Sequence, residues 1–314
     1  SERGFTMEAG AHQRTRQSWR RRAGSADVPP ALAEVPVGDP ARPAASFATP
    51  AVFRGLCSAW PACRWTEQSL ARALPTVRVS RSRSGEYPRD SASGKPCPME
   101  TVPTARFLAA LREGPPTVYV HGEVLPDALL ADCPPPHPLL RGERVARRSL
   151  WLSGDGARSP LHYDLPMVLL CQLHGRKRVT LYSPRYHDLM RPQCSTWPAL
   201  TAQERIAGTS LGAAELRGCE GLVVELRPGD ALLMPSGWWH EVESVGDARD
   251  RLCASVGLNW PSIADALPAF ASHRDAVRAY PVLTQGRVVA MMHGEAKARA
   301  ALPRAQYDLP VFAE

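Results

Sequence analysis

The 314-residue sequence lacks features that would each define a class of protein. No apolar run approaches the ~18 residues that a membrane-spanning helix needs, so we expect no membrane span. None of the eight cysteines forms a CxxC pair, which argues against a zinc knuckle or a redox-active dithiol. Charged residues are 22% and hydrophobic residues 44% of the chain, close to the average for folded proteins. The sequence therefore predicts a soluble, folded protein.

A secretory signal is also lacking before the cysteines. Cys171 and Cys253 lie inside apolar runs, where a free thiol packs as a small hydrophobic side chain. We therefore expect an intracellular, reducing compartment, cytoplasmic or nuclear. The formal charge of +7 is uneven, because residues 1–25 contain six arginines and two glutamates. This Arg-rich start is compatible with a solvated tail, a nucleic-acid-binding arm or an organelle-targeting segment, and a solvated tail is the commonest.

Changes in composition and proline-rich loops divide the chain into four segments. Residues 1–27 have little apolar content and no periodicity, which predicts a disordered basic tail. Residues 28–146 contain strand patterns at 51–55 and 117–120 and a helix pattern at 101–112, so we expect an α/β flank. Residues 261–314 contain two Ala-rich helix patterns, at 263–280 and 286–302.

Residues 147–260 are a series of short β-type runs at 149–152, 167–173, 177–182, 222–226, 230–234, 238–242 and 251–258. His174-Gly175 and the segment 227–230 predict hairpin turns between neighbouring runs. Many short strands at this spacing are typical of a barrel or jelly roll. We therefore expect a mainly-β protein with some α-helix, in which a double-stranded β-helix core carries the N-terminal α/β flank and the C-terminal helices.

One pair of residues in this core has metal-binding spacing. His162 and Asp164 are two apart on an extended segment, so their side chains point to the same side and can bind one ion. His240 follows another predicted strand and would complete the set if the two strands face each other. Two imidazoles and one carboxylate, with open coordination positions, are expected of a non-haem Fe(II) oxygenase. The alternative is a structural histidine beside Trp238 and Trp239.

Three segments in this order resemble the JmjC (cupin-like) family of oxygenases: SPLHYD at 159–164, GRKRVTLYSP at 175–184, and PSGWWH at 235–240 followed by Asn259-Trp260. The resemblance covers roughly residues 117–260. It implies a double-stranded β-helix, Fe(II) held by His162, Asp164 and His240, and 2-oxoglutarate and O2 as cosubstrates. It favours the hydroxylase subgroup, because the chain lacks CxxC-type zinc modules and because Gly or Ala in place of Asp164 would be needed to admit a halide.

The same resemblance implies residues that bind the cosubstrate. Lys177, fifteen positions after His162, corresponds to a lysine that binds the distal carboxylate of 2-oxoglutarate in similar enzymes. A buried ammonium needs such a partner, whereas the alternative is a surface lysine in a hairpin. Ser159 and Tyr119 would assist the same carboxylate. Their structural alternatives are a turn residue and a half-buried strand residue.

Asn259 resembles an asparagine near the iron-bound end of the cosubstrate, with a strand-end cap as the structural alternative. Many relatives carry asparagine six positions after the first histidine ligand, and this chain has Val168 there. A polar contact to the cosubstrate is therefore missing or comes from elsewhere in the fold.

The sequence indicates the substrate less clearly than it indicates the metal ligands. Overall size, residues 183–185 and the C-terminal residues 299–308 resemble the hydroxylases that synthesise wybutosine, which implies a hypermodified guanosine in tRNA. A positive Arg-rich tail would suit a phosphate backbone. The alternative enzyme is a protein side-chain hydroxylase of asparaginyl, arginyl or lysyl type. A metal-free cupin that acts as a scaffold is the third hypothesis, and the C-terminal helices could form a homodimer interface.

Overall fold

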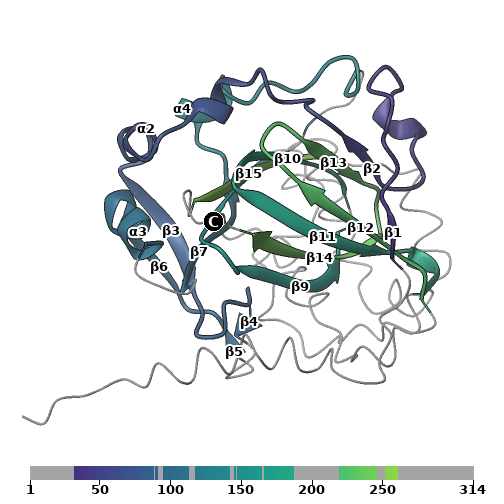
Figure 1. Cartoon of the computed structure of the whole chain (residues 1–314). Coiled ribbons are helices and arrows are strands. Elements are labelled where there is room, and N and C mark those ends of the chain that lie inside the picture. Colours follow the sequence, from purple (N-terminus) through teal and green to yellow (C-terminus); the bar gives the residue numbers. More distant parts are fainter. Residues whose placement is uncertain are drawn as a thin grey trace, which may run out of the picture.

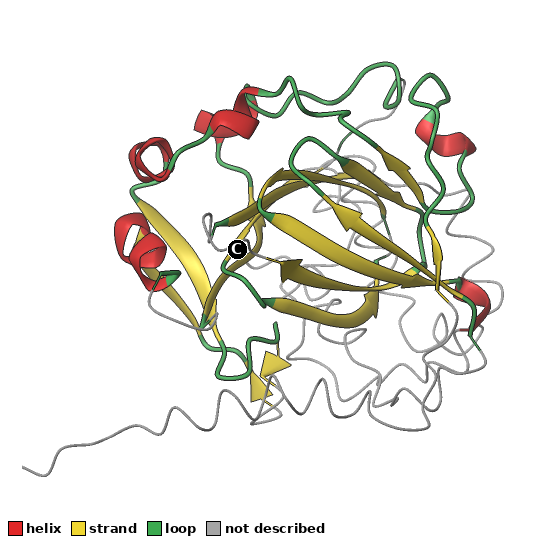
Figure 2. Cartoon of the chain, in the orientation of Figure 1, coloured by secondary structure: helices red, strands yellow, loops and turns green. Residues whose placement is uncertain are grey.

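The computed structural model describes residues 32–87, 89–90, 95–112, 117–141, 145, 147–164, 166–186, 219–245 and 252–260. These residues form two large β-sheets and one small one, with a few short helices at the periphery (Figures 1 and 2). The predicted basic tail and both predicted C-terminal helices lie outside the described residues. Within the described part of the chain, no helix is long and apolar enough to cross a membrane.

The first large sheet has five strands, in the order β1 (Leu32–Glu34), β12 (Gly221–Leu226), β11 (Arg176–Tyr182), β14 (Trp239–Val245) and β9 (Arg158–Tyr163). Its β1–β12 pair is parallel and its other pairs are antiparallel. The second has eight strands, in the order β2 (Ala51–Phe53), β13 (Ala231–Met234), β10 (Met167–His174), β15 (Cys253–Trp260), β8 (Arg147–Ser153), β7 (Val118–Val124), β3 (Thr76–Arg81) and β6 (Met99–Pro103).

The remaining elements are short. They are the strand pair β4 (Arg89–Asp90) and β5 (Lys95–Pro96), the helices α2 (Glu67–Ala73), α3 (Thr104–Ala110) and α4 (Asp127–Leu130), and 3-10 turns at Ala44–Ser46, Pro61–Arg64 and Pro184–Tyr186. A capping box starts α2, in which the Thr66 side chain accepts from the Ser69 amide and the Ser69 side chain accepts from the Thr66 amide. In Figure 1, α2 and α3 lie beside β3 and β6, on the outside of the eight-stranded sheet.

Strands of the 147–260 segment change sheet at every step except from β11 to β12, which are paired neighbours. β8, β10, β13 and β15 belong to the eight-stranded sheet, and β9, β11, β12 and β14 to the five-stranded one. The predicted turns at Gly175 and at 227–230 exist, but they lead from one sheet to the other, so the hairpin predictions are wrong. Local turn chemistry indicates a chain reversal and does not determine the next pairing partner. At Gly175, with φ +62°, an added Cβ would lie 3.0 Å from the Leu252 carbonyl oxygen.

Each face of the eight-stranded sheet has its own core. The outer face packs alternate residues of β8, β10 and β15 against the helices in a large apolar cluster that includes Leu70, Phe107, Leu152, Leu169 and Leu258. The inner face contributes to a smaller cluster between the two sheets, with Val168, Leu170, Val179, Leu181 and Val242. The polar residues described below lie in the same inter-sheet space, which is where the candidate site forms.

The mainly-β prediction is confirmed, and the predicted β-type runs correspond to strands. The double-stranded β-helix is a finer prediction that the alternation of strands between the sheets supports. The helix predicted at 101–112 is wrong at its start, because residues up to Pro103 belong to β6 and the helix begins at Thr104. Ser159, for which a turn residue was the structural alternative, lies in the first part of β9. The predicted division at residue 146 falls between β7 and β8, which are paired neighbours in one sheet.

Candidate metal centre

An irregularity in β9 aims two predicted site residues at the same space. His162 lies opposite His240 of β14, but Ser159 lies opposite Val242, so β9 has one residue more than β14 over this stretch. Side chains alternate along a regular strand, and residues three apart would face opposite sides. The extra residue is a β-bulge, a feature common next to active sites. It allows both Ser159 and His162 to be buried between the sheets.

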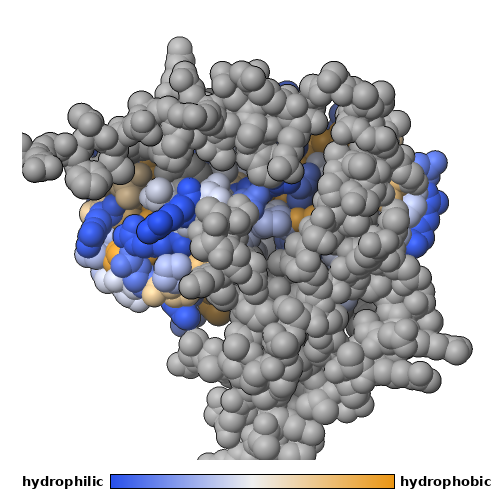
Figure 3. Space-filling model, turned by 90° about the horizontal axis from the view of Figure 1, so that it is seen from below, coloured by the Kyte–Doolittle hydropathy of each residue, from blue (hydrophilic) through white to orange (hydrophobic). Residues whose placement is uncertain are grey.

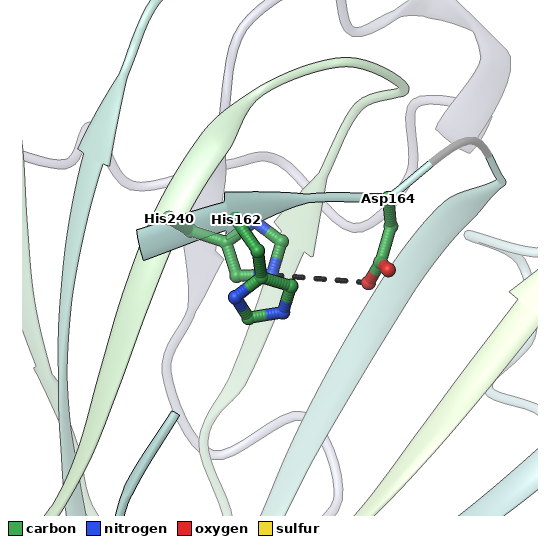
Figure 4. Close-up of side chains that lie close together, drawn as sticks. All are labelled: His162, Asp164 and His240. Atoms are coloured by element: carbon green, nitrogen blue, oxygen red, sulfur yellow. Dashed lines mark ion pairs between the residues drawn. The ribbon is translucent and has the colours of Figure 1, made fainter. Parts of the chain in front are cut away.

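The three predicted metal ligands meet at one end of this space. One ligand atom from each of His162, Asp164 and His240 lies within 4.8 Å of the other two. The imidazole rings are 4.2 Å apart between centroids, and His240 Nε2 lies 3.8 Å from Asp164 Oδ2 (Figure 4). Asp164 follows the last residue of β9, and Figure 4 shows its carboxylate turned toward the rings.

Backbone contacts orient both histidines. The His162 Nδ1 atom is 2.7 Å from the Pro160 carbonyl oxygen, and the His240 Nδ1 atom is 2.9 Å from the Trp238 carbonyl oxygen. A carbonyl accepts only, so each Nδ1 carries the proton and donates it. The Nε2 atom of each ring is then free of a proton and able to bind a metal. Metal-binding histidines in proteins are commonly fixed in this way.

Electrostatics keep His240 in the form that binds metal. The pKa of His240 is lowered to about 4, mainly by burial and also by the neighbouring His162, while Asp164 and the hydrogen bond to the Trp238 backbone partly oppose the lowering. Neutral imidazole is the species that coordinates a metal, so His240 is ready to bind at neutral pH without releasing a proton. Two imidazoles and one carboxylate fit a divalent transition-metal ion such as Fe(II).

Lys177 lies deeper in the same space and is only 2% exposed. Its ammonium donates a 3.5 Å hydrogen bond to the Tyr119 hydroxyl and lies 5.7 Å from the centre of the Trp151 ring. Within the described ranges, no carboxylate forms an ion pair with it. The alternative of a surface hairpin lysine is therefore wrong. A buried ammonium in an uncharged setting favours binding of an anion.

Tyr119 contacts this ammonium, and Ser159 is hydrogen-bonded to Tyr119. Burial raises the pKa of Tyr119, while the charge of Lys177 and hydrogen bonds to Lys177 and Ser159 oppose that rise. Ser244 lies opposite Lys177 in the sheet, and its hydroxyl is 2.9 Å from that of Ser153. Hydroxyl groups from both sheets thus gather near the ammonium and can hydrogen-bond an oxyanion held there.

Asn259 lies on the inner face of β15, directly between Val168 of β10 and Arg147 of β8. Its Oδ1 atom is buried and has no hydrogen-bond partner among the described residues. A buried acceptor without a partner is costly, so this position favours a bound group that donates a hydrogen bond. No hydrogen bond in the described part of the chain joins Asn259 to the three metal ligands.

Sequence reasoning missed two residues that line the interior, Trp151 and His121. Their rings contact each other with centroids 4.7 Å apart, and both also lie against Tyr119. Burial lowers the pKa of His121 to about 3, with smaller contributions from His162 and Lys177. Trp151 could have been found from the alternation of its predicted strand, but His121 had no distinguishing signal.

Comparisons with known proteins agree with this geometry. The model of the cupin-like domain family matches residues 42–266, more than half of the chain. Jumonji C domain-containing protein 5 of Drosophila melanogaster is 40% identical over 100 residues, which are 30% of this chain and 24% of that protein. Lysine-specific demethylase JMJ31 of Arabidopsis thaliana is 29% identical over 133 residues, covering 39% of this chain and 22% of that protein.

The chain is also similar to HSPB1-associated protein 1 of Mus musculus, over a longer stretch and with lower identity. These two proteins are 23% identical over 259 residues, which are 69% of this chain and 53% of the mouse protein. The chain therefore spans about half or less of the length of these curated relatives.

Proposed function

Since this chain belongs to the cupin-like domain family, we propose that it is an oxygenase that depends on Fe(II) and 2-oxoglutarate. The observation that carries the proposal is a single interior containing both the His162, Asp164 and His240 group and the buried ammonium of Lys177. A metal group alone would fit many functions. A buried cation at the other end of the same space is what a cosubstrate with a distal carboxylate requires. In this proposal the two sheets form a double-stranded β-helix around the cosubstrate.

Each residue has a defined role in this proposal. His162, Asp164 and His240 hold the metal, and the Pro160 and Trp238 carbonyls keep both Nε2 atoms directed at it. Lys177 binds the distal carboxylate of 2-oxoglutarate, with the hydroxyls of Tyr119 and Ser159 as further donors. Bound Fe(II), 2-oxoglutarate and O2 would supply the oxidation of a substrate C–H bond to C–OH, with succinate and CO2 as coproducts.

The metal and the ammonium are separated by a suitable length of strand. Leu181 of β11 lies opposite His240, whereas Lys177 lies opposite Ser244. Four residues of strand correspond to ~13 Å at about 3.3 Å per residue. The long lysine side chain and a five-carbon dicarboxylate can together span that separation. Asn259 would face the metal-bound end of the cosubstrate.

For the substrate we propose a macromolecule, with two candidate classes. The tRNA candidate, a guanosine of the wybutosine type, rests on the sequence, including the six arginines of residues 1–25. The protein candidate, hydroxylation of an asparaginyl, arginyl or lysyl side chain, gains support from a relative whose name is lysine-specific demethylase. Binding of RNA should weaken steeply with salt, whereas peptide binding should depend on salt only weakly. A homodimer through the C-terminal residues remains part of the proposal.

The proposal is tested by anaerobic titration of the purified protein with Fe(II) and then 2-oxoglutarate. We expect the weak visible charge-transfer band of a metal-bound 2-oxo acid. His162→Ala should abolish the band, and Lys177→Met should require a much higher 2-oxoglutarate concentration for the same band. Arg178→Met is the matched control, because Arg178 is exposed on the same strand as Lys177. Absence of the band in the intact protein would favour the metal-free scaffold instead.

A further inference from the structure

A charged side chain that the proposed function does not use lies on the wall of the site. Arg147 belongs to β8, whose register with β15 is continuous from Arg147 to Ser153. Leu150 and Leu152 of this strand face the outer apolar core, whereas Trp151 and Ser153 face the interior. Alternation therefore puts Arg147 on the interior face, at the end of the strand away from Ser153.

This end of the strand is the metal end of the interior. Arg147 lies opposite Asn259, and Asn259 lies opposite Val168, so the three residues form one row across three neighbouring strands. Val168 follows the metal ligand Asp164 by only four positions. Burial lowers the pKa of Arg147, and the charges of Glu123 and, to a smaller extent, Asp164 oppose that lowering.

Two hydrogen bonds hold the Arg147 side chain in place. Its Nε donates to the Ser149 hydroxyl at 3.0 Å, and its Nη2 donates to the Gly122 carbonyl at 2.6 Å. Gly122, with φ +67°, is the extra residue of a bulge in β7, which brings its carbonyl out of the regular ladder. Arginine has five N–H donors, so three remain. Arg147 is also exposed to solvent.

The row therefore combines an oriented cation at Arg147 with an apolar residue at Val168. A guanidinium fixed on one side matches a planar oxyanion on the other. Resting on the proposed function, we infer that Arg147 binds an oxyanion beside the metal and so supplies the polar contact that Val168 does not offer. The oxyanion is either the cosubstrate carboxylate next to the oxo group or an anionic group of the substrate.

Two measurements on the Mn(II)-loaded protein, neither of which needs turnover, test the role and separate the sources. The first is calorimetric titration with 2-oxoglutarate. The second is the paramagnetic broadening of the 31P signal of inorganic phosphate by Mn(II) in the presence of saturating 2-oxoglutarate. The variants are Arg147→Met, Arg147→Lys and, as matched control, Arg178→Met. Circular dichroism checks that each variant is folded.

If the cosubstrate supplies the oxyanion, Arg147→Met should weaken 2-oxoglutarate binding at least ~10-fold, since a charge-assisted hydrogen bond is lost. Arg147→Lys should lie between that variant and the intact protein. If the substrate supplies it, 2-oxoglutarate affinity should stay unchanged and Arg147→Met should lose the phosphate broadening. Arg178→Met should behave as the intact protein in both measurements.

The inference is overturned if Arg147→Met matches the intact protein in both measurements. That result differs from failure of the proposed function. If the proposed function fails, the intact protein and Arg178→Met will also bind no Mn(II) or no 2-oxoglutarate. The role of Arg147 is then rejected together with the oxygenase.

Discussion

Successive residues of β15 face opposite sides of the sheet, and the two sides carry different kinds of side chain. Ala254, Val256 and Leu258 face outward into the large apolar core, with Trp260 at the end of the strand. The inward positions are Cys253, Ser255, Gly257 and Asn259, which are small or polar. Buried apolar area stabilises a fold, whereas buried polar groups cost free energy unless a partner satisfies them. One strand thus holds the fold together with one face and lines the candidate site with the other.

Hydrophilic and hydrophobic residues are less clearly separated on the surface than in the interior. Figure 3 shows a mixture of hydrophilic and hydrophobic residues over the visible part of the described surface. Such mixtures are normal for folded proteins, in which much of the exposed area is apolar. The informative contrast therefore lies inside the molecule, between the outer core and the inter-sheet space, and the predictions below test it.

The largest effect is expected for a change at the metal group. His162→Ala should weaken Mn(II) binding at least ~100-fold, since loss of even a residue that only supports a ligand costs 10- to 100-fold. Binding is measured by electron paramagnetic resonance of free Mn(II). The control is His174→Ala, because His174 bonds the Ala62 carbonyl away from the site. Equal affinity in His162→Ala and the intact protein would contradict the assignment.

On the outer face of β15, truncation of an apolar side chain should lower the stability of the fold and leave Mn(II) binding unchanged. Leu258→Ala should lower the free energy of unfolding by about 2–5 kcal/mol, because it leaves a cavity in a closely packed core. Urea denaturation measures this loss. The Mn(II) affinity of the folded variant should equal that of the intact protein. A change in affinity as large as that of His162→Ala would mean that the two faces are not separable.

Most of the candidate site could be predicted from local sequence. His162, Asp164, His240 and Lys177 occur in short segments whose spacing and strand pattern are visible in one chain, and the structure brings them into one interior. The predictions that failed depend on pairing between strands that are far apart in the sequence. The turn at Gly175 suggested a hairpin, but β10 pairs with β13 and β15, which lie far along the chain.

The bulge in β9 could not be predicted from the local sequence for the same reason. A bulge is a mismatch between two strands, so it is defined only once the partner β14 is known. The segment before His162 contains glycine, serine and proline, which are common in turns, so Ser159 had a turn residue as its structural alternative. His121 likewise gains its setting from Trp151 across the β7–β8 pair, which no local pattern reveals.

The low pKa of His240 gives a pH dependence in the metal-free protein. Its pKa is about 4 in the folded state, below its ordinary value of 6.5. Between these values the unfolded chain binds a proton that the folded protein does not, so stability falls as pH decreases from about 6.5 to 4. We expect a loss of about 1–3 kcal/mol in urea denaturation. His240→Gln should flatten the curve, although His121 contributes a similar slope. An unchanged slope would contradict the assignment.

The smallest effect is expected on the inner face of β15. The Ser255 hydroxyl is buried and has no partner among the described residues, so Ser255→Ala removes a polar group that contributes no bond there. Stability should change by less than about 0.5 kcal/mol or increase slightly, since an unsatisfied buried hydroxyl is itself costly. Leu258→Ala, three residues away on the opposite face, is the matched comparison. If both substitutions cost several kcal/mol in urea denaturation, Ser255 supports the fold through a partner such as water, and the inner face is more than a lining for the site.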